Sequence, residues 1–266
     1  MKILIISSNL IGDTILSTGV VDYFHKKHPQ AKFTFLIGPS AGQIYINFPS
    51  KEKIILIKKK RFNLHWLDMY LSVNTVKWDI VIDFRSSLIS YLLFKKKKYI
   101  FKKEKNLNHI DQLKKFFKVK KLSLFISTNK NEEIKAFQNL SNKYRYVVLF
   151  PGGNWKPKIW PTDYFNQLIN LLNNEFADLK FIIVGSSNEK NIYYNEIKKN
   201  LPNNIFIDLM GETLSSTSAY MKKSTLFIGN DSGLMHLSFA SNLTTIGLFG
   251  PTNDIIYGHR NHKSFV

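Results

Sequence analysis

Two short polar turns with the potential to bind a ligand lie in the stretch 224–252. The turn Asn230–Gly233 follows the apolar run Leu226–Gly229, and the turn Gly250–Thr252 follows the apolar run Thr244–Phe249. In parallel sheets, ligands bind beyond the carboxyl ends of the strands, where helix N-termini offer free N–H groups to phosphate. The two turns therefore predict a phosphate-bearing ligand, although capping and turn chemistry accounts for each of them separately.

A carboxylate follows the first apolar run of the chain. Gly12 and Asp13 come shortly after the expected strand Lys2–Ser7, at the start of an expected helix. A helix N-terminus favours the ionised form of a carboxylate, and an ionised Asp13 facing a cleft can accept a proton from a sugar hydroxyl as a general base. The alternative is that Asp13 is only a helix cap. Gly12 does not belong to a Gly-x-Gly-x-x-Gly fingerprint, which this segment lacks.

A glycine-rich turn and a lysine occur together in the segment Leu149–Pro161. Gly152 and Gly153 permit close approach of a ligand to the backbone, and Pro161 is suited to the first turn of a helix. Lys158, between them, could neutralise a diphosphate leaving group, or it could be an ordinary surface lysine.

A further turn, Val184–Glu189, follows the next expected strand. The carboxylate of Glu189 could bind the hydroxyls of a ribose. The alternative is an acidic residue that stabilises the first turn of a helix.

The composition bounds the class of protein. A chain of 266 residues, 44% hydrophobic, is long enough for two domains with real cores. It has no cysteine, which excludes disulfides and thiolate metal sites and is typical of a reducing compartment. The N-terminal apolar run is too short for a signal peptide, and no apolar run reaches the ~18 residues that span a bilayer. We expect a cytoplasmic protein.

The positive charge is concentrated in the first half of the chain. Residues 1–130 hold 25 lysines and arginines against 8 aspartates and glutamates, whereas residues 131–266 hold 13 against 11. We therefore expect the first half to meet an anionic partner. A nucleic acid is the least favoured partner, because the charge lies apart from the glycine-rich turns and no nucleic-acid motif is present.

Strand-like and helix-like segments alternate along both halves. The expected strands are Lys2–Ser7, Lys32–Ile37, Lys53–Ile57, Trp78–Asp83, Tyr146–Phe150, Lys180–Val184, Ile205–Ile207, Leu226–Gly229 and Thr244–Phe249. The expected helices are Thr14–Lys27, Ala41–Phe48, His65–Thr75, Ser86–Phe94, Thr162–Asn174, Asn188–Lys199, Ser215–Lys222 and Leu234–Ala240. The lysine-rich segments Lys95–Lys105 and Lys114–Lys121 are expected to be solvated surface.

This alternation predicts an α/β protein with parallel sheets covered on both faces. A polar break at Ser127–Lys143 separates two such series. We expect two doubly wound, Rossmann-like domains, residues 1–130 and 131–266, that face each other across a cleft.

Taken together, the motifs resemble glycosyltransferase family 9, the bacterial lipopolysaccharide heptosyltransferases. The matching residues are Gly12-Asp13, Pro151-Gly152-Gly153, Lys158-Ile159-Trp160-Pro161, the Gly185–Glu189 turn, Asp231-Ser232-Gly233-Leu234-Met235-His236-Leu237 and Phe249-Gly250-Pro251-Thr252. The resemblance implies a GT-B fold and transfer of a heptose from an ADP-activated donor with inversion. It implies no cofactor and no required metal, in agreement with the absence of an Asp-x-Asp motif.

The resemblance also implies roles for single residues. Asp13 would be the general base, and Lys158 would stabilise the departing ADP. Glu189 would contact the adenosine ribose, and Asp231 would contact the donor sugar. The other residues expected around the donor are Gly12, Gly152, Gly153, Ser232, Gly233, His236, Gly250 and Thr252. His236 is alternatively a core residue of its helix.

The acceptor implied by the resemblance is an anionic, lipid-linked oligosaccharide, which would explain the basic first half and place the protein on the inner face of the inner membrane. Gly19 stands where the family often has proline. Family members usually continue beyond the Gly-Pro-Thr loop with further helices. Two alternatives remain open: a GT-B protein that uses another nucleotide sugar, and a truncated, inactive protein that only binds a nucleotide sugar.

Overall fold

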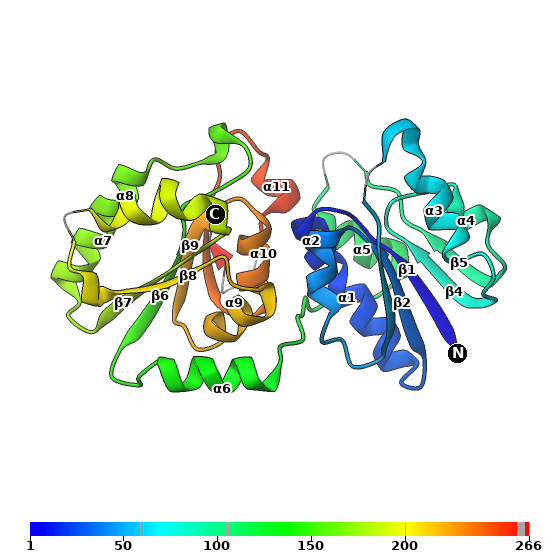
Figure 1. Ribbon diagram of the computed structural model, residues 1–266, viewed down its shortest axis with the longest axis horizontal. Coiled ribbons are helices and arrows are strands. Elements are labelled where there is room, and N and C mark those ends of the chain that lie inside the picture. The colour runs from blue at the N-terminus through cyan, green and yellow to red at the C-terminus, as the bar shows by residue number, and fades with distance from the viewer. Residues whose placement is uncertain (59, 105–106, 200, 260–263, 266) are drawn as a thin grey trace. The chain divides into compact units, whose positions relative to one another are not determined.

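The chain forms two compact units, Met1–Ser127 (unit 1) and Thr128–Val266 (unit 2). The computed structural model describes residues 1–58, 60–104, 107–199, 201–259 and 264–265. Figure 1 shows unit 1 in blue to teal and unit 2 in green to red. Each unit is a parallel sheet with helices on its faces, so the expectation of two doubly wound α/β domains is confirmed.

Unit 1 is built on a five-stranded parallel sheet in the order β3-β2-β1-β4-β5. Its strands are β1 (Lys2–Ile6), β2 (Lys32–Ile37), β3 (Lys51–Leu56), β4 (Trp78–Asp83) and β5 (Lys95–Ile100). β1 lies in the centre because four of its five residues are apolar and fully buried, as a strand covered on both faces requires. The chain reverses its direction of winding between β1 and β4, so their carboxyl ends form the switch point of this sheet.

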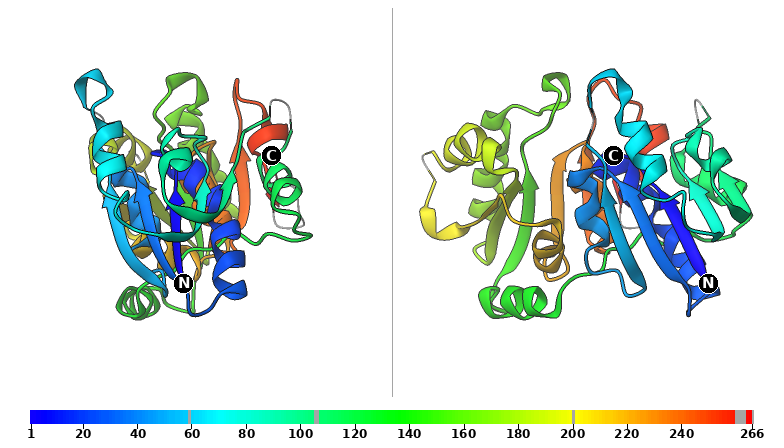
Figure 2. Two further views of the ribbon diagram at one scale, coloured as in Figure 1. Left: turned by 90° about the vertical axis from the view of Figure 1, so that its right-hand side faces the viewer. Right: turned by 45° about the vertical axis from the view of Figure 1, so that its right-hand side comes forward.

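The helices of unit 1 cover both faces of the sheet. They are α1 (Ile11–Lys27), α2 (Pro39–Gly42), α3 (His65–Leu71), α4 (Ile89–Leu92) and α5 (His109–Phe117). Met69 of α3 and Ile89 of α4 belong to one buried cluster with Leu4 of β1, so these two helices share one face. In the left view of Figure 2, α3 (cyan) and α1 (blue) lie on opposite sides of the sheet.

Unit 2 is built on a six-stranded parallel sheet in the order β11-β10-β9-β6-β7-β8. Its strands are β6 (Arg145–Phe150), β7 (Leu179–Gly185), β8 (Phe206–Met210), β9 (Leu226–Asn230), β10 (Thr244–Leu248) and β11 (Ser264–Phe265). The switch point lies between β6 and β9, the two central strands. This strand order is that of a dinucleotide-binding fold.

The helices of unit 2 are α6 (Lys130–Asn139), α7 (Thr162–Glu175), α8 (Asn195–Lys198), α9 (Leu214–Met221), α10 (Gly233–Ala240) and α11 (Asp254–Tyr257). α7 packs Phe165 and Ile169 into a core that also contains Val147 and Leu149 of β6 and Phe181 of β7. This core supports the strands whose carboxyl ends carry the glycine-rich turns.

One lysine-rich segment that was expected to be only solvated surface contains a strand. Lys95–Ile100 is β5, which pairs with β4 along its whole length. Because β5 is an edge strand, its lysine side chains reach solvent while its backbone remains in the sheet. α5 includes Lys114 and Lys115 of the other lysine-rich segment and buries Leu113 and Phe117, so that segment also contributes to the core. Lys105 lies outside the described residues.

One helix was missed, and several expected helices differ in extent or type, such as Ser86–Phe94, of which only α4 is helical. The polar break at Ser127–Lys143 contains α6, which begins with a capping box formed by Asn129 and Glu132. The expected helix Ala41–Phe48 is replaced by α2 and a 3₁₀ turn, Gln43–Tyr45. The expected helix Asn188–Lys199 begins with a 3₁₀ turn and a π-helical turn, Lys190–Tyr194, before α8. Competing hydrogen-bond patterns at helix ends leave no trace in apolar periodicity, which explains the two irregular helices. α6 was missed because it buries only Ala136 and so has little apolar periodicity, although its capping box is readable in the sequence.

The core of unit 2 gives a stability prediction. Phe165→Ala should lower the free energy of unfolding by about 3–5 kcal/mol, because Phe165 is fully buried and packs edge-on to Trp160 at 4.9 Å between ring centres. Leu171 of the same helix is 69% exposed, and Leu171→Ala is the matched control, with an expected change within about 0.5 kcal/mol. Urea unfolding followed by tryptophan fluorescence measures both, and equal losses would contradict the assignment of Phe165 to the core.

The first residue of α5 gives a prediction about pH. Burial of His109, and next the charge of Lys103, lower the pKa of this imidazole to about 4. The unfolded chain takes up this proton near pH 6.5 and the native protein only near pH 4. The stability that His109 contributes is therefore fully present above about pH 6.5 and is lost as the pH falls towards 4, a loss of about 3 kcal/mol.

The measurement compares the parent with His109→Gln, which cannot titrate, in urea unfolding at about pH 7 and about pH 4.5. The variant should lose less stability than the parent on acidification. His259 acts in the same direction in both proteins, because burial also lowers its pKa, and it therefore cancels in the comparison. Equal acid losses in the two proteins would exclude His109 as a cause.

Candidate functional site

The predicted donor residues of unit 2 come from loops at one edge of its sheet. Because β6, β7, β9 and β10 are all parallel, the loops that follow them emerge at the same edge. These loops carry Gly152 and Gly153, Glu189, Asp231 to Gly233, and Gly250 and Thr252. Lys158 belongs to a 3₁₀ turn, Lys156–Lys158, in the segment after β6.

Lys158, Asp231 and Thr252 form one cluster. Lys158 Nζ lies 2.7 Å from Asp231 Oδ2, and Thr252 Oγ1 donates a hydrogen bond to the same oxygen at 2.6 Å. The side chain of Asp231 is only 5% exposed, whereas that of Lys158 is 24% exposed. A buried carboxylate needs such partners, and the pair holds a lysine at the edge of the sheet. Within the part of the chain that the structure describes, Asp231 is the one hydrogen-bond partner of the Lys158 ammonium, which leaves two N–H donors for further contacts.

Asn230 connects this cluster to the glycine-rich turn. Its side chain is buried, donates to the carbonyl oxygens of Pro151 at 2.9 Å and Gly152 at 3.0 Å, and accepts from the backbone N–H of Trp160 at 3.0 Å. One amide therefore fixes both ends of the segment that carries Lys158. From the sequence Asn230 was expected only as a turn residue, because nothing in the sequence reveals contacts made 70 to 79 residues away.

Both oxygens of Glu189 are engaged within the protein. Oε1 accepts from Gly153 N at 2.9 Å, and Oε2 accepts from the backbone N–H and the hydroxyl of Ser186 at 2.8 and 2.6 Å. A carboxylate has about four acceptor positions, and three are used here. Glu189 thus joins the loops after β6 and β7. A Cβ at residue 152 would lie 2.2 Å from Oε1, so glycine is required there for this contact.

Ser232 caps α10, since its hydroxyl accepts from the backbone N–H groups of Leu234 and Met235. Gly233 is the first residue of that helix. His236, in the same helix, is buried, and its Nδ1 lies 2.8 Å from Nε2 of His259. His236 thus contributes to the packing of α10.

Gly250 brings the loop after β10 against the turn that carries Lys158. A Cβ at this position would lie 2.7 Å from the carbonyl oxygen of Pro157. A larger residue would therefore push apart the two segments that supply Thr252 and Lys158.

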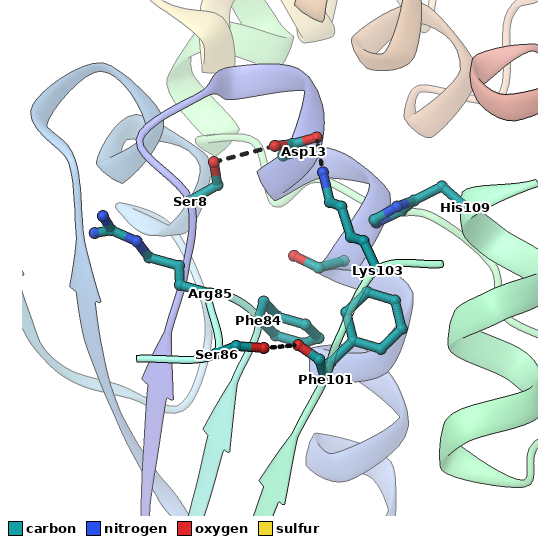
Figure 3. Close-up of a pocket in the computed structure, with 9 residues that line it drawn as sticks. Ser8, Asp13, Phe84, Arg85, Ser86, Phe101, Lys103 and His109 are labelled. Carbon is teal, nitrogen blue, oxygen red and sulfur yellow. Dashed lines mark hydrogen bonds and ion pairs between the residues drawn. The ribbon is translucent and has the colours of Figure 1, made fainter. Parts of the chain in front are cut away.

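Unit 1 has a pocket at the switch point of its own sheet, with a volume of ≈ 360 Å³. It lies beyond the carboxyl ends of β1 and β4 and is drawn in Figure 3. Its lining residues are Ser8, Asp13, Ser17, Phe84, Arg85, Ser86, Phe101, Lys103 and His109. Polar and charged groups surround a floor of phenylalanine rings, an arrangement suited to a polar ligand with apolar surface.

Asp13 lies in the first turn of α1, directly after Gly12, and faces this pocket. Its Oδ1 lies 2.8 Å from Lys103 Nζ, and its Oδ2 accepts from Ser8 Oγ at 3.3 Å. Figure 3 shows Lys103 reaching up to the carboxylate. Lys103 and the N-terminus of α1 both place positive charge beside this carboxylate. Asp13 therefore meets the geometric requirement for a base: a part-exposed carboxylate in a pocket.

The two cations of this pocket, Lys103 and Arg85, were not identified from the sequence. Lys103 was hidden in a lysine-rich segment, and nothing distinguished it from its neighbours. Arg85 follows the carboxyl end of β4, a position that could have drawn attention to it. The guanidinium of Arg85 lies 5.3 Å from the Trp66 ring centre, and burial lowers its pKa. Asp83, which is buried, accepts a hydrogen bond from the backbone N–H of Arg85 at 2.7 Å.

Within the described ranges, no group of three or more histidine, aspartate or glutamate side chains could hold a metal ion. None of the helices described there is long and apolar enough to cross a membrane.

Solved structures resemble the whole chain. A glycosyl transferase family 9 protein from Veillonella parvula aligns with a TM-score of 0.81 at 20% identity, over 100% of this chain and 86% of that one. The E. coli heptosyltransferase WaaC with ADP aligns with a TM-score of 0.78 at 17% identity, over 100% and 92% of the two chains. These likenesses show that the fold is GT-B.

Two relatives of known activity agree at the level of sequence. A lipooligosaccharide heptosyltransferase 2 of Campylobacter jejuni is 28% identical over 95% of this chain and 82% of its own length. A lipopolysaccharide heptosyltransferase 1 of Campylobacter coli is 23% identical over 95% and 84%. The sequence pattern described as glycosyltransferase family 9 (heptosyltransferase) matches residues 111–264. Since that match covers more than half of the chain, including Lys158, Asp231 and Thr252, this protein belongs to glycosyltransferase family 9.

Proposed function

We propose that the protein transfers a heptose, with inversion, from ADP-heptose to the core oligosaccharide of a lipopolysaccharide. The observation that carries this proposal is the position of Lys158, a part-exposed cation that buried Asp231 holds at the ligand-binding edge of the unit 2 sheet. The relatives named as heptosyltransferases support the transferred sugar. The E. coli structures described with ADP and with a fluorinated ADP-heptose support the donor.

In this proposal residues 131–266 bind the donor. The N–H donors of Lys158 that Asp231 does not use would contact the diphosphate, and the N-terminus of α10 would add its positive dipole. Asp231 would orient Lys158 and contact the donor sugar together with Thr252. The Gly152-Gly153 turn, which Glu189 and Asn230 hold in place, would let the backbone approach the nucleotide.

Residues 1–130 would hold the acceptor. Asp13 would take the proton from the acceptor hydroxyl as that oxygen attacks the anomeric carbon from the face opposite the diphosphate. The new glycosidic bond forms while the bond from the anomeric carbon to the diphosphate breaks, and ADP departs with its charge neutralised by Lys158. Lys103 would hold the Asp13 carboxylate in place before the reaction and would also meet an anionic acceptor.

The first prediction for this function concerns Asp13→Asn, which keeps the size of the side chain but removes its basic oxygen. Turnover should fall about 100-fold or more, because general-base catalysis contributes about that much. Donor affinity, measured by calorimetry, should hardly change. Asp22→Asn is the matched control on the same helix, where Asp22 pairs with Lys26 at 2.6 Å, and it should retain full turnover.

Full turnover by Asp13→Asn would show that Asp13 is only a helix cap. If the parent itself binds a nucleotide sugar but turns over none, the protein is an inactive nucleotide-sugar-binding protein.

The second prediction concerns Lys158→Ala. Donor affinity should fall about tenfold or more, because a charge-assisted contact to the diphosphate is lost, and turnover should fall as well. Lys156→Ala, an exposed lysine of the same 3₁₀ turn, should change neither. Calorimetry with ADP-, UDP- and GDP-sugars measures both variants and the parent.

A clear preference of the parent for UDP- or GDP-sugars would show that the donor is not ADP-heptose. It would leave the proposed role of Lys158 unchanged. Equal affinities of Lys158→Ala and Lys156→Ala for the preferred donor would refute that role.

A further inference from the structure

α3 and α4 of unit 1 are apolar on their outward faces as well as their inward ones. α3 buries Met69 on its inward face, and its outward face exposes Leu67 and Leu71. A surface helix normally presents polar residues to water, so this second apolar face requires an explanation.

The same pattern occurs in α4 and around it. Ile89 and Leu93 are buried, whereas Leu88, Leu92 and the following Phe94 are exposed, Leu88 by 79% and Phe94 by 70%. α3 and α4 contact each other and lie side by side in Figure 1. The exposed apolar residues of these two adjoining helices and of the residues beside them are together called the α3–α4 apolar face: Leu64, Leu67, Leu71, Leu88, Leu92 and Phe94. Grouped apolar side chains of this kind mark a binding surface.

Cations border this face at both ends. Lys58, Lys60 and Arg61 precede α3 and are exposed. On the other side, β5 follows α4, and its Lys98 Nζ lies 4.3 Å from the centre of the Tyr91 ring of α4.

Lys95 is close to the same helix. Its Nζ donates to the carbonyl oxygens of Tyr91 and Leu93, both at 2.9 Å. The acidic residues nearby are already paired, Asp68 with Lys60 and Asp79 with Lys96, each at 2.7 Å. The border of the face is therefore strongly positive.

We propose that the α3–α4 apolar face is the surface by which the protein docks on an anionic lipid bilayer. Leucine and phenylalanine side chains can enter the boundary between headgroups and acyl chains, while the bordering lysines meet anionic headgroups. A protein partner fits less well, because protein–protein interfaces are depleted in lysine.

The position of this face also adds detail to the proposed function. Only this part of the proposal rests on that function. Trp66 of α3 lies against Arg85, and Arg85 lines the pocket that contains Asp13. A docked α3–α4 apolar face would bring that pocket close to the membrane surface, where a lipid-linked acceptor is held.

The test is co-sedimentation with two kinds of vesicle, one of phosphatidylcholine alone and one of phosphatidylcholine and phosphatidylglycerol in equal parts. The parent should bind the anionic vesicles far better, and binding should weaken with salt as the charges are screened. The double variant Leu67→Gln/Leu92→Gln should partition about tenfold or more less strongly, because it removes two apolar contacts and keeps helix-forming residues. Leu171→Gln is the matched control, since Leu171 is a 69% exposed leucine of α7 in unit 2.

Circular dichroism and urea midpoints check that the variants fold. A second variant, Arg61→Gln/Lys98→Gln, should weaken binding to the anionic vesicles and reduce the salt dependence of that binding. If the leucine variant does not fold, this second variant is used to test the proposal. No binding by the parent, or equal binding by the parent and the leucine variant, overturns the proposal. So does equal loss in the Leu171→Gln control.

Analytical ultracentrifugation distinguishes a second copy of this chain as the occupant. A parent dimer that the leucine variant abolishes, without vesicle binding, also overturns the proposal. Donor calorimetry separates this test from the proposed function. If the parent binds the donor but no vesicles, only the docking is refuted, and if the parent binds vesicles but no donor, only the proposed function is refuted.

Discussion

All strands of each sheet run in the same direction, and this constraint decides where the chemistry of the protein lies. Parallel pairing sends the loops after β6, β7, β9 and β10 to one edge of unit 2, and it brings the ends of β1 and β4 together in unit 1. Residues far apart in the chain, such as Lys158 and Asp231, meet for this reason. The strands themselves need only be apolar, so the loops are free to carry polar groups.

Each unit contains an aspartate–lysine ion pair, and the two pairs differ in how accessible the carboxylate is. In each, an aspartate near the carboxyl end of a strand pairs with a lysine from another segment: Asp13 with Lys103 at 2.8 Å, and Asp231 with Lys158 at 2.7 Å. Asp231 is the more buried of the two carboxylates, so in unit 2 the lysine is the group left partly exposed. Asp13 itself reaches the pocket, so in unit 1 the carboxylate remains accessible. Unit 2 therefore presents mainly the cation of its pair, whereas the pocket of unit 1 is lined by both Lys103, 43% exposed, and Asp13, 20% exposed.

Much of the fold could be predicted from the sequence, because buried parallel strands such as Lys32–Ile37 and Trp78–Asp83 are short segments rich in apolar β-branched and aromatic residues between turns. β5 was missed because an edge strand needs little apolar surface, so four consecutive lysines gave no sign of it. Motif residues such as Lys158 and Asp231 were identified by spacing and resemblance. Lys103, Arg85 and Asn230 were not, because their importance depends on contacts with residues remote in sequence.

The lysines of β5 have a consequence for the behaviour of the protein in concentrated solution. An edge strand offers unpaired N–H and C=O groups to any other chain, and it is a usual starting point for aggregation. Lys95 to Lys98 give this edge a dense positive charge, so two copies that approach edge to edge repel each other. The same residues that conceal the strand in the sequence thus protect it from intermolecular β-pairing.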